Sequence, residues 1–217
     1  TLAGGWLESS CAAGYALAQV RSVGRHSMTN GAGGFLKLCL HRRSVRRFRN
    51  LPVDREKLMR CLEAARLAPS AENRQPWRFV VFDDPAEKER LARAVFRGVY
   101  AVSARFADAP VLVCLLIRED VLVNRLAKVS QGVPYQFVDA GIAGEHFVLA
   151  AAEQGIGTCW IGWFDTRALV RHLKLQGRGF RPIALIAVGY PAEDAGGAVP
   201  KRRALADTVF WNRPPDR

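Results

Sequence analysis

Apolar residues recur along the chain in short periodic runs, which predict helices alternating with strands. Residues 35–41 are expected to form a short helix. Pro52 to Asp54 open a stronger one, in which an apolar stripe runs from Leu58 to Leu67 and ends at Pro69. Further helices are expected from Asp84 to about Arg97, from Val138 to Gln154 and from Thr166 to Leu173. The strands are expected at residues 79–82, 110–117, 157–163 and 183–188.

This alternation indicates one domain in which helices cover a sheet, of the α/β or α+β class. The longest apolar run, residues 110–117, has the length of a strand and is too short to cross a bilayer. Residues 1–33 are rich in Gly, Ala and Ser and lack the basic, then apolar pattern of a signal peptide. They are expected to be an N-terminal extension of unknown role, followed by a folded domain over residues 34–217.

The chain of 217 residues carries 32 Lys and Arg against 20 Asp and Glu, a formal net charge of +12. The basic residues are spread along the sequence and are not interleaved with aromatic residues, which favours a basic surface over a nucleic-acid groove. Five cysteines without a Cys-x-x-Cys pair indicate reduced thiols in a cytoplasmic protein. Neither the cysteines nor the four histidines have the spacing of metal ligands, so no metal is expected. From the spread of the basic residues and the short apolar runs, no nucleic-acid or membrane partner is expected either.

Two basic clusters are candidates for binding an anion. Arg42, Arg43, Ser44 and Arg46 place guanidinium groups and a hydroxyl within five residues, which suits a phosphate dianion. Taken alone, such a stretch is more often a solvated surface. Lys201, Arg202 and Arg203 form the second cluster, which either completes a phosphate site or belongs to a basic tail.

Two further segments suit a flat, polar ligand. Between Pro69 and Trp77, the side chains of Ser70, Asn73 and Gln75 are expected to lie on a stiff loop without local partners, free to bind a ribityl chain or the edge of a ring. The alternative is a connection that Trp77 anchors to the core. Near residue 162, Gly162 would let the backbone approach a flat ligand and present an N–H group. The alternative there is a helix end followed by a turn.

The sequence contains no Ser-His-Asp order, His-Glu-x-x-His motif, P-loop or deaminase signature. Chemistry would therefore depend on an organic cofactor, and no catalytic side chain is named.

Together, these segments resemble the nitroreductase family of FMN-dependent oxidoreductases. The resemblance covers about Phe35 to Trp211 and rests on the ordered set of motifs: Arg-Arg-Ser-Val-Arg-Arg-Phe from Arg42, Ala-Pro-Ser-Ala-x-Asn-x-Gln-Pro-Trp from Ala68, Asp-Ala-Pro-Val from Asp108, Ala-Ala-x-x-Gly-Ile-Gly-Thr-Cys-Trp-Ile-Gly from Ala151, Val-Gly-Tyr-Pro from Val188, and Arg202-Arg203. It implies an α+β fold with a central, mostly antiparallel mixed sheet flanked by helices. It also implies an intertwined homodimer with two FMN sites at the interface.

The resemblance also implies roles for individual residues. The FMN phosphate would be held by Arg42, Arg43 and Ser44 with Arg202 or Arg203. Arg46 would lie near ring atom N1, the backbone at Ile161 and Gly162 near N5, and Arg105 near the ring. Ser70 and Asn73 of the partner protomer, in the loop that also holds Pro69 and Gln75, would contact the ribityl chain and ring edge. Glu72 departs from the family pattern, which often has Gly in this slot.

The implied reaction is ping-pong. NAD(P)H reduces FMN and leaves, and an electron-poor small molecule, such as a nitroaromatic, quinone or flavin, then binds where the nicotinamide was and is reduced by FMN. Three alternatives stay open at this point. The same fold could serve a flavin-dependent dehydrogenase, oxidase or dehalogenase, or a non-catalytic flavin-binding protein. The third, a nucleic-acid-binding module, is suggested by the charge alone.

Overall fold

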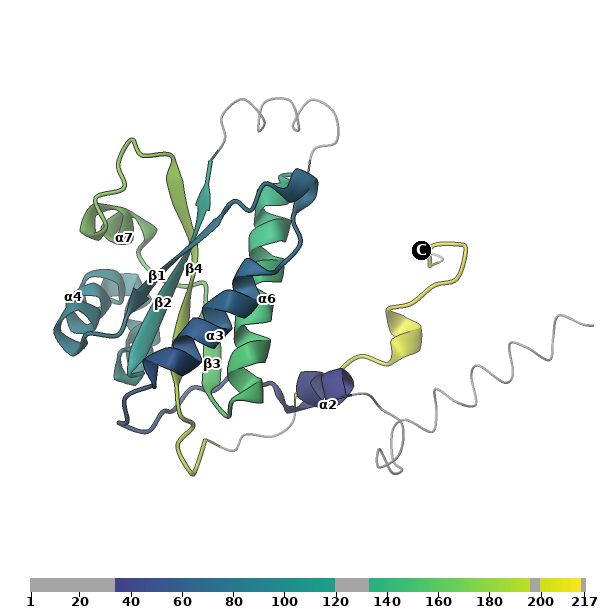
Figure 1. Ribbon diagram of the computed structural model, residues 1–217, viewed down its shortest axis with the longest axis horizontal. Coiled ribbons are helices and arrows are strands. Elements are labelled where there is room, and N and C mark those ends of the chain that lie inside the picture. The colour runs from purple at the N-terminus through teal and green to yellow at the C-terminus, as the bar shows by residue number, and fades with distance from the viewer. Residues whose placement is uncertain (1–33, 120–132, 196–199, 216–217) are drawn as a thin grey trace, which may run out of the picture. The chain divides into compact units, whose positions relative to one another are not determined.

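The computed structural model describes residues 34–119, 133–195 and 200–215 (Figure 1). The expected extension, residues 1–33, lies outside them. The chain divides into two compact units, one of residues 36–196 and one of residues 1–35 and 197–217, and each is described by itself. In the second unit, the described C-terminal residues contain one 3-10 turn, η3 (Leu205–Asp207).

The larger unit is built around an antiparallel sheet. Its described strands are β1 (Trp77–Phe82), β2 (Val111–Arg118), β3 (Gly157–Ile161) and β4 (Phe180–Gly189), in the order β1-β2-β4-β3. All three strand pairings are antiparallel, with Trp77 opposite Ile117 and Ile161 opposite Leu185. A single parallel bridge joins Ser44 to Thr158 at the outer edge of β3. The fold is therefore α+β, as the sequence predicted.

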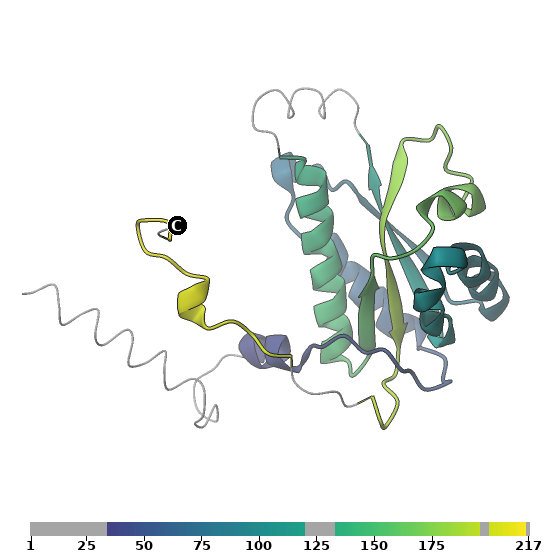
Figure 2. The ribbon, with the colours of Figure 1, turned by 180° about the vertical axis from the view of Figure 1, so that it is seen from behind.

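Helices cover both faces of this sheet. The helices α3 (Arg55–Arg66) and α6 (Tyr135–Glu153) lie on one face, and α4 (Pro85–Val95) and α7 (Thr166–His172) lie on the other (Figures 1 and 2). Successive residues of β2 point to opposite faces, so Leu112 and Cys114 join one buried cluster and Val111 and Val113 another. Because both faces are covered, β2 is apolar and buried from Val111 to Ile117 and does not alternate.

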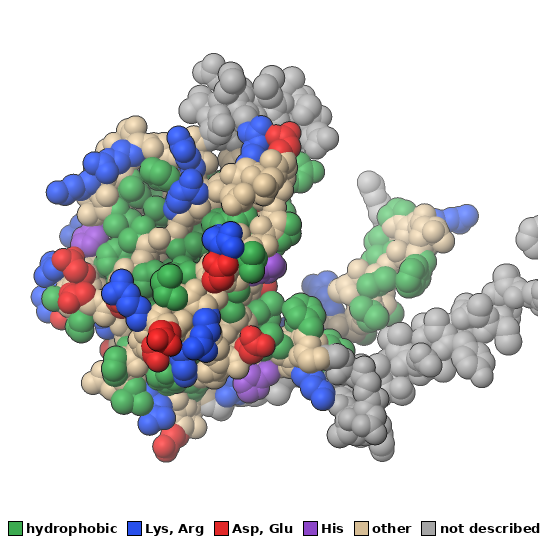
Figure 3. All heavy atoms as spheres, viewed as in Figure 1, with side chains coloured by type: hydrophobic (Ala, Val, Ile, Leu, Met, Phe, Trp, Pro, Cys, Tyr) green, Lys and Arg blue, Asp and Glu red, His purple; other side chains and the backbone are tan. Residues whose placement is uncertain are grey.

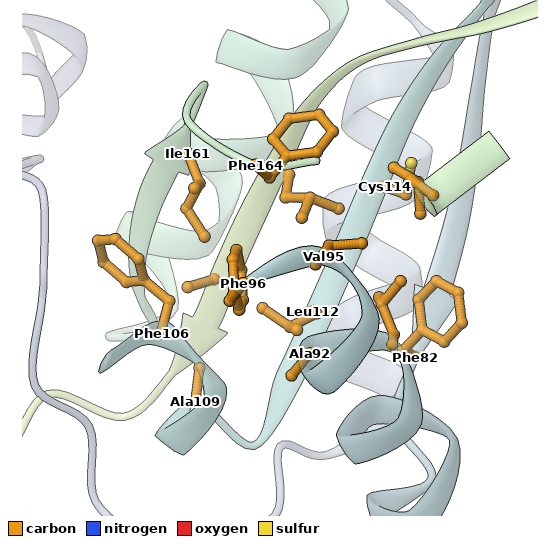
Figure 4. Packing of buried hydrophobic residues seen from close by; sticks show 14 of the residues in the cluster. Phe82, Ala92, Val95, Phe96, Phe106, Ala109, Leu112, Cys114, Ile161 and Phe164 are labelled. Atoms are coloured by element: carbon orange, nitrogen blue, oxygen red, sulfur yellow. The ribbon is translucent and has the colours of Figure 1, made fainter. Parts of the chain in front are cut away.

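The buried cluster on the α4 side joins the sheet to a segment for which the sequence pattern predicts neither a helix nor a strand. This segment is the 3-10 helix η2 (Gly98–Asp108), and its Phe106 packs with Phe96, Ile161 and Phe164 (Figure 4). Its mixed apolar and polar residues follow neither a helical nor a strand period, which is why the pattern did not reveal it.

The other predicted elements are present with shifted ends. The short helix α2 spans Gly34–His41, and α6 begins at Tyr135, three residues before the predicted start. The predicted cap at Asp54 is confirmed, because its carboxylate accepts a hydrogen bond from the N–H of Glu56 at 2.8 Å. None of the described helices has the length and apolar character needed to cross a membrane.

Two glycines of α6 provide a matched test of the packing between this helix and β3. A Cβ on Gly144 would lie 2.1 Å from the Trp160 ring, whereas one on Gly141 would meet nothing within 4 Å. We expect Gly144→Ala to lower the free energy of unfolding by about 1–3 kcal/mol through overpacking. Gly141→Ala should raise it by up to about 1 kcal/mol through helix propensity. Urea unfolding measures both, and equal effects of the two substitutions would contradict this packing.

Candidate functional site

The first basic cluster lies along the outer edge of β3. The N–H of Val45 donates to the carbonyl of Thr158 at 2.8 Å, and Ser44 forms the parallel bridge with the same residue. This approach is close because Gly157 has no side chain: a Cβ there would lie 2.7 Å from a methyl group of Val45. Gly157 therefore lets the basic segment lie directly against the strand.

The residues of this segment differ in burial. Val45 is 4% exposed and packs inward, whereas Arg43, Ser44 and Arg46 are exposed and Arg42 is half-buried. The N–H of Arg42 donates to the Leu38 carbonyl at 2.8 Å, so Arg42 still belongs to the last turn of α2. The segment that holds all four predicted residues thus lies beside β3.

The buried thiol of Cys159, in β3, shows which groups gather here. Burial raises its pKa, and four side chains act in the opposite direction through charge or hydrogen bonding: Arg46, Ser44, Arg105 and Arg42. Arg105 comes from η2, so three arginines from two segments lie close enough to Cys159 to influence its thiol. The thiol itself stays protonated and buried, which excludes it as a nucleophile.

The arginines of this cluster differ in their acidic partners. Arg42 approaches Glu145 of α6, with 3.7 Å between Nε and Oε1, and the pKa of Glu145 is raised by burial although Arg42 and His146 oppose the shift. Among the described residues, no carboxylate lies in ion-pair range of Arg46 or Arg105. The helix-surface arginines Arg66 and Arg93, by contrast, pair with a glutamate one turn away. No sequence pattern pointed to Glu145, because its contact with Arg42 depends on the docking of α6.

Gly162 follows β3 directly and is open to its surroundings. A Cβ on this residue would meet nothing within 4 Å. Ile161, which precedes it, is 3% exposed and fixes the strand to the core. Gly162 is thus exposed directly after a buried residue, and its contact with a flat ligand stays a prediction.

The polar loop with Pro69, Ser70, Asn73 and Gln75 has a different environment from the one expected. Its side chains do have local partners: the Ser70 hydroxyl accepts from the N–H of Gln75 at 2.9 Å, and the Gln75 amide donates to Asn73 Oδ1 at 2.9 Å. The expectation of unpaired side chains is wrong because positive φ angles at Glu72 (51°), Asn73 (53°) and Gln75 (48°) fold the loop back on itself. The left-handed conformation of Glu72 is one that glycine adopts more easily.

This loop and the arginine cluster lie at opposite edges of the sheet. The loop leads into β1, whereas the cluster follows β3, three strand intervals or about 14 Å away. Both contact α6, since Asp139 accepts from the N–H of Ala71 at 3.0 Å and Glu145 approaches Arg42. Those two α6 residues differ by about 9 Å along the helix and about 120° around it. One chain alone therefore does not bring the two groups together.

Arg202 and Arg203 belong to the C-terminal unit, in which both are exposed. Their assignment to a phosphate site stays a prediction.

Comparison with known proteins identifies the family. The model of the nitroreductase family matches residues 40–190, well over half of the chain. The chain belongs to the nitroreductase family. The match includes the arginine segment, the polar loop, Arg105 and the end of β3.

Individual relatives agree with this assignment. A protein of Thermus thermophilus named NADH dehydrogenase is 33% identical over 198 residues, covering 79% of this chain and 93% of that protein. The crystal structure of a nitroreductase family protein from Streptococcus pneumoniae is 28% identical, covers 82% of this chain and all of that chain, and has a TM-score of 0.66. A crystal structure described as an oxidoreductase containing FMN is 26% identical, with a TM-score of 0.71, and covers 89% of this chain and 97% of that chain.

Proposed function

We propose that this nitroreductase family member binds FMN and uses NAD(P)H to reduce an electron-poor small molecule, such as a nitroaromatic, a quinone or a flavin. The observation that carries the proposal is the convergence of Arg42, Arg46 and Arg105 beside the open backbone of Gly162. Relatives with names such as NAD(P)H nitroreductase support the same class of reaction.

The residues present fit this cofactor. FMN combines a phosphate dianion with a planar ring, and the cluster offers guanidinium groups next to a backbone position without a side chain. The fixed positive charge suits a ring that gains negative charge on reduction. When bound, FMN supplies the centre that accepts a hydride and passes the electrons on.

Each residue has a proposed role. Arg42, Arg43 and Ser44 bind the phosphate with Arg202 or Arg203. Arg46 and Arg105 stabilise negative charge on the ring, and the N–H at Gly162 donates to it. The protein supplies position and charge. The Cys159 thiol at the cluster is protonated and buried, so it does not act as a nucleophile.

A second copy of the chain would complete the site. Ser70 and Asn73, with Pro69 and Gln75 beside them, lie at the opposite sheet edge, so the partner's loop is the one proposed to reach the arginine cluster. The helix α2 supports a homodimer, since none of its residues is buried although Phe35 (68% exposed), Leu36 (48%) and Leu40 (60%) are apolar.

We place the enzyme in the cytoplasm without a nucleic-acid or membrane partner. Lys and Arg side chains on the face shown in Figure 3 are scattered among acidic ones and do not form one continuous patch. Reduced cysteines agree with this location: Cys39, Cys61, Cys114 and Cys159 are all free thiols.

An absorbance spectrum of the purified protein tests the proposed reaction directly. We expect a flavin spectrum that bleaches when NADH or NADPH is added without oxygen. A spectrum that stays unchanged with both donors would argue for a flavin-binding protein or for a dehydrogenase reduced by an organic substrate. Colourless protein that also fails to take up added FMN would overturn the proposal.

Removing a phosphate ligand should reduce the amount of bound flavin. We expect Arg42→Ala and Ser44→Ala to purify with much less FMN per chain, because each removes a donor to the phosphate, worth about 1.5–3 kcal/mol for a charged group. Flavin absorbance relative to protein absorbance measures the loss. Arg93→Ala is the control, since Arg93 is an exposed residue of α4 that pairs with Glu89. Full retention of FMN in both variants would refute the phosphate assignment.

Gly162→Ala separates cofactor binding from folding. The added methyl group meets nothing within 4 Å in this chain, so the thermal midpoint of the apoprotein should stay within a few degrees of that of the wild type. Affinity for FMN should fall, because the methyl group occupies the approach to the backbone N–H. Titration of the apoprotein with FMN measures it. Unchanged affinity would show that the flavin does not approach residue 162.

A further inference from the structure

Trp163, the residue after Gly162, is an exposed aromatic side chain that the assigned cofactor roles leave unused. It is 56% exposed, although Ile161 (3%) and Phe164 (4%) on either side of the pair are buried in the same apolar cluster (Figure 4). Gly162 and Trp163 therefore lie outside the core, between two residues that belong to it. The large aromatic side chain of Trp163 is not part of that buried cluster.

Two contacts with η2 hold the indole in place, and a third holds the Trp163 backbone. Its Nε1 donates to the carbonyl of Val99 at 2.9 Å, and its ring lies 5.3 Å from the Tyr100 ring, centroid to centroid. The buried hydroxyl of Ser103 donates to the Trp163 carbonyl at 2.7 Å. The side chain has thus already lost most of its rotational freedom, so binding of a ligand to it costs little additional side-chain entropy.

The surroundings of Trp163 define the ligand that it would suit. Val99 and Val102 of η2 are apolar and exposed (75% and 65%), which adds non-polar surface near the indole. Arg105 follows on the same helix and contributes positive charge beside β3. An electron-rich indole attracts the face of an electron-poor ring, and the arginine attracts its partly negative oxygen atoms. These features together favour a planar, electron-poor aromatic molecule over an aliphatic one.

We propose that Trp163 is a specificity-determining residue that stacks on the electron acceptor and selects planar aromatic acceptors. The proposal rests on the function proposed above, because it places the acceptor next to the flavin contact at Gly162. Binding of the acceptor then depends on the indole, whereas reduction of the enzyme by NAD(P)H does not.

Binding and turnover of two contrasting acceptors test this role. 1,4-Naphthoquinone is planar and aromatic, whereas ferricyanide takes electrons without stacking. In Trp163→Ala, we expect the dissociation constant of the naphthoquinone, measured without NAD(P)H from its effect on the visible spectrum of the oxidised holoenzyme, to rise roughly tenfold. Its KM should rise by a similar factor with little change in kcat. Ferricyanide reduction and FMN content should stay at the wild-type level.

Two further variants separate stacking from general packing. Trp163→Phe keeps an aromatic face and should retain most of the affinity, whereas Trp163→Leu keeps apolar volume without a flat ring and should behave as Trp163→Ala does. Met59→Ala is the control, because Met59 is equally exposed (58%) but lies on α3, across the sheet.

The outcomes distinguish this inference from the proposed function. Wild-type affinity for the naphthoquinone in both Trp163→Ala and Trp163→Leu would overturn the stacking role and leave the flavin assignment intact. Loss of FMN and of ferricyanide reduction in these variants would also overturn it, since Trp163 would then support the cofactor and not the acceptor. A wild-type protein that takes up no FMN would refute the proposed function itself.

Discussion

The cationic site depends on one close backbone contact, in which residues 44 and 45 lie against the start of β3. The contact is a hydrogen bond from Val45 to Thr158, and it exists because Gly157 leaves room for the Val45 side chain. With Val45 fixed inward, Ser44 and Arg46 on either side of it stay exposed beside the strand. A close contact between a valine and a glycine thus holds the basic segment against the sheet.

The sheet then determines where polar groups can gather. Because most residues of β2 and β4 are buried on both faces, their side chains form the core, and their charged residues, Arg118 and Arg181, are exposed. The candidate site residues lie beside the two outer strands: the arginines beside β3 and the Ser70 loop before β1. A sheet of this width keeps these two groups apart within one chain, which is why the loop of a partner chain is the one proposed to reach the arginine cluster.

Local signals predicted most of the fold. Asp54 caps its helix as expected, and Asp84 caps the helix that was predicted to start there, because a capping carboxylate acts on N–H groups two or three residues away. The buried strands were evident as apolar runs. The helix η2 was not, since its period of three residues matches neither the α-helical nor the strand pattern.

The site was predictable in composition and less so in geometry. The sequence placed Arg42, Arg43, Ser44 and Arg46 in one cluster, but it did not reveal Glu145 beside Arg42, because that contact depends on how α6 packs. The interpretation of the Ser70 loop failed for a similar reason. Residue types suggested free polar side chains, whereas the left-handed backbone at three positions brings Ser70, Asn73 and Gln75 into contact.

In this chain with a net charge of +12, the arginines of the helices and those beside β3 differ in their ion pairs. Surface arginines on α3 and α4 pair with glutamates three or four residues away, so much of their potential is cancelled locally. Arg46 and Arg105 come from an extended segment and a 3-10 helix, where no such helical spacing supplies a carboxylate, and within the described residues neither has one in range. Excess charge alone would attract any polyanion. Charge left unpaired beside an open backbone and a fixed indole instead favours a small ligand that is anionic at one end and planar at the other.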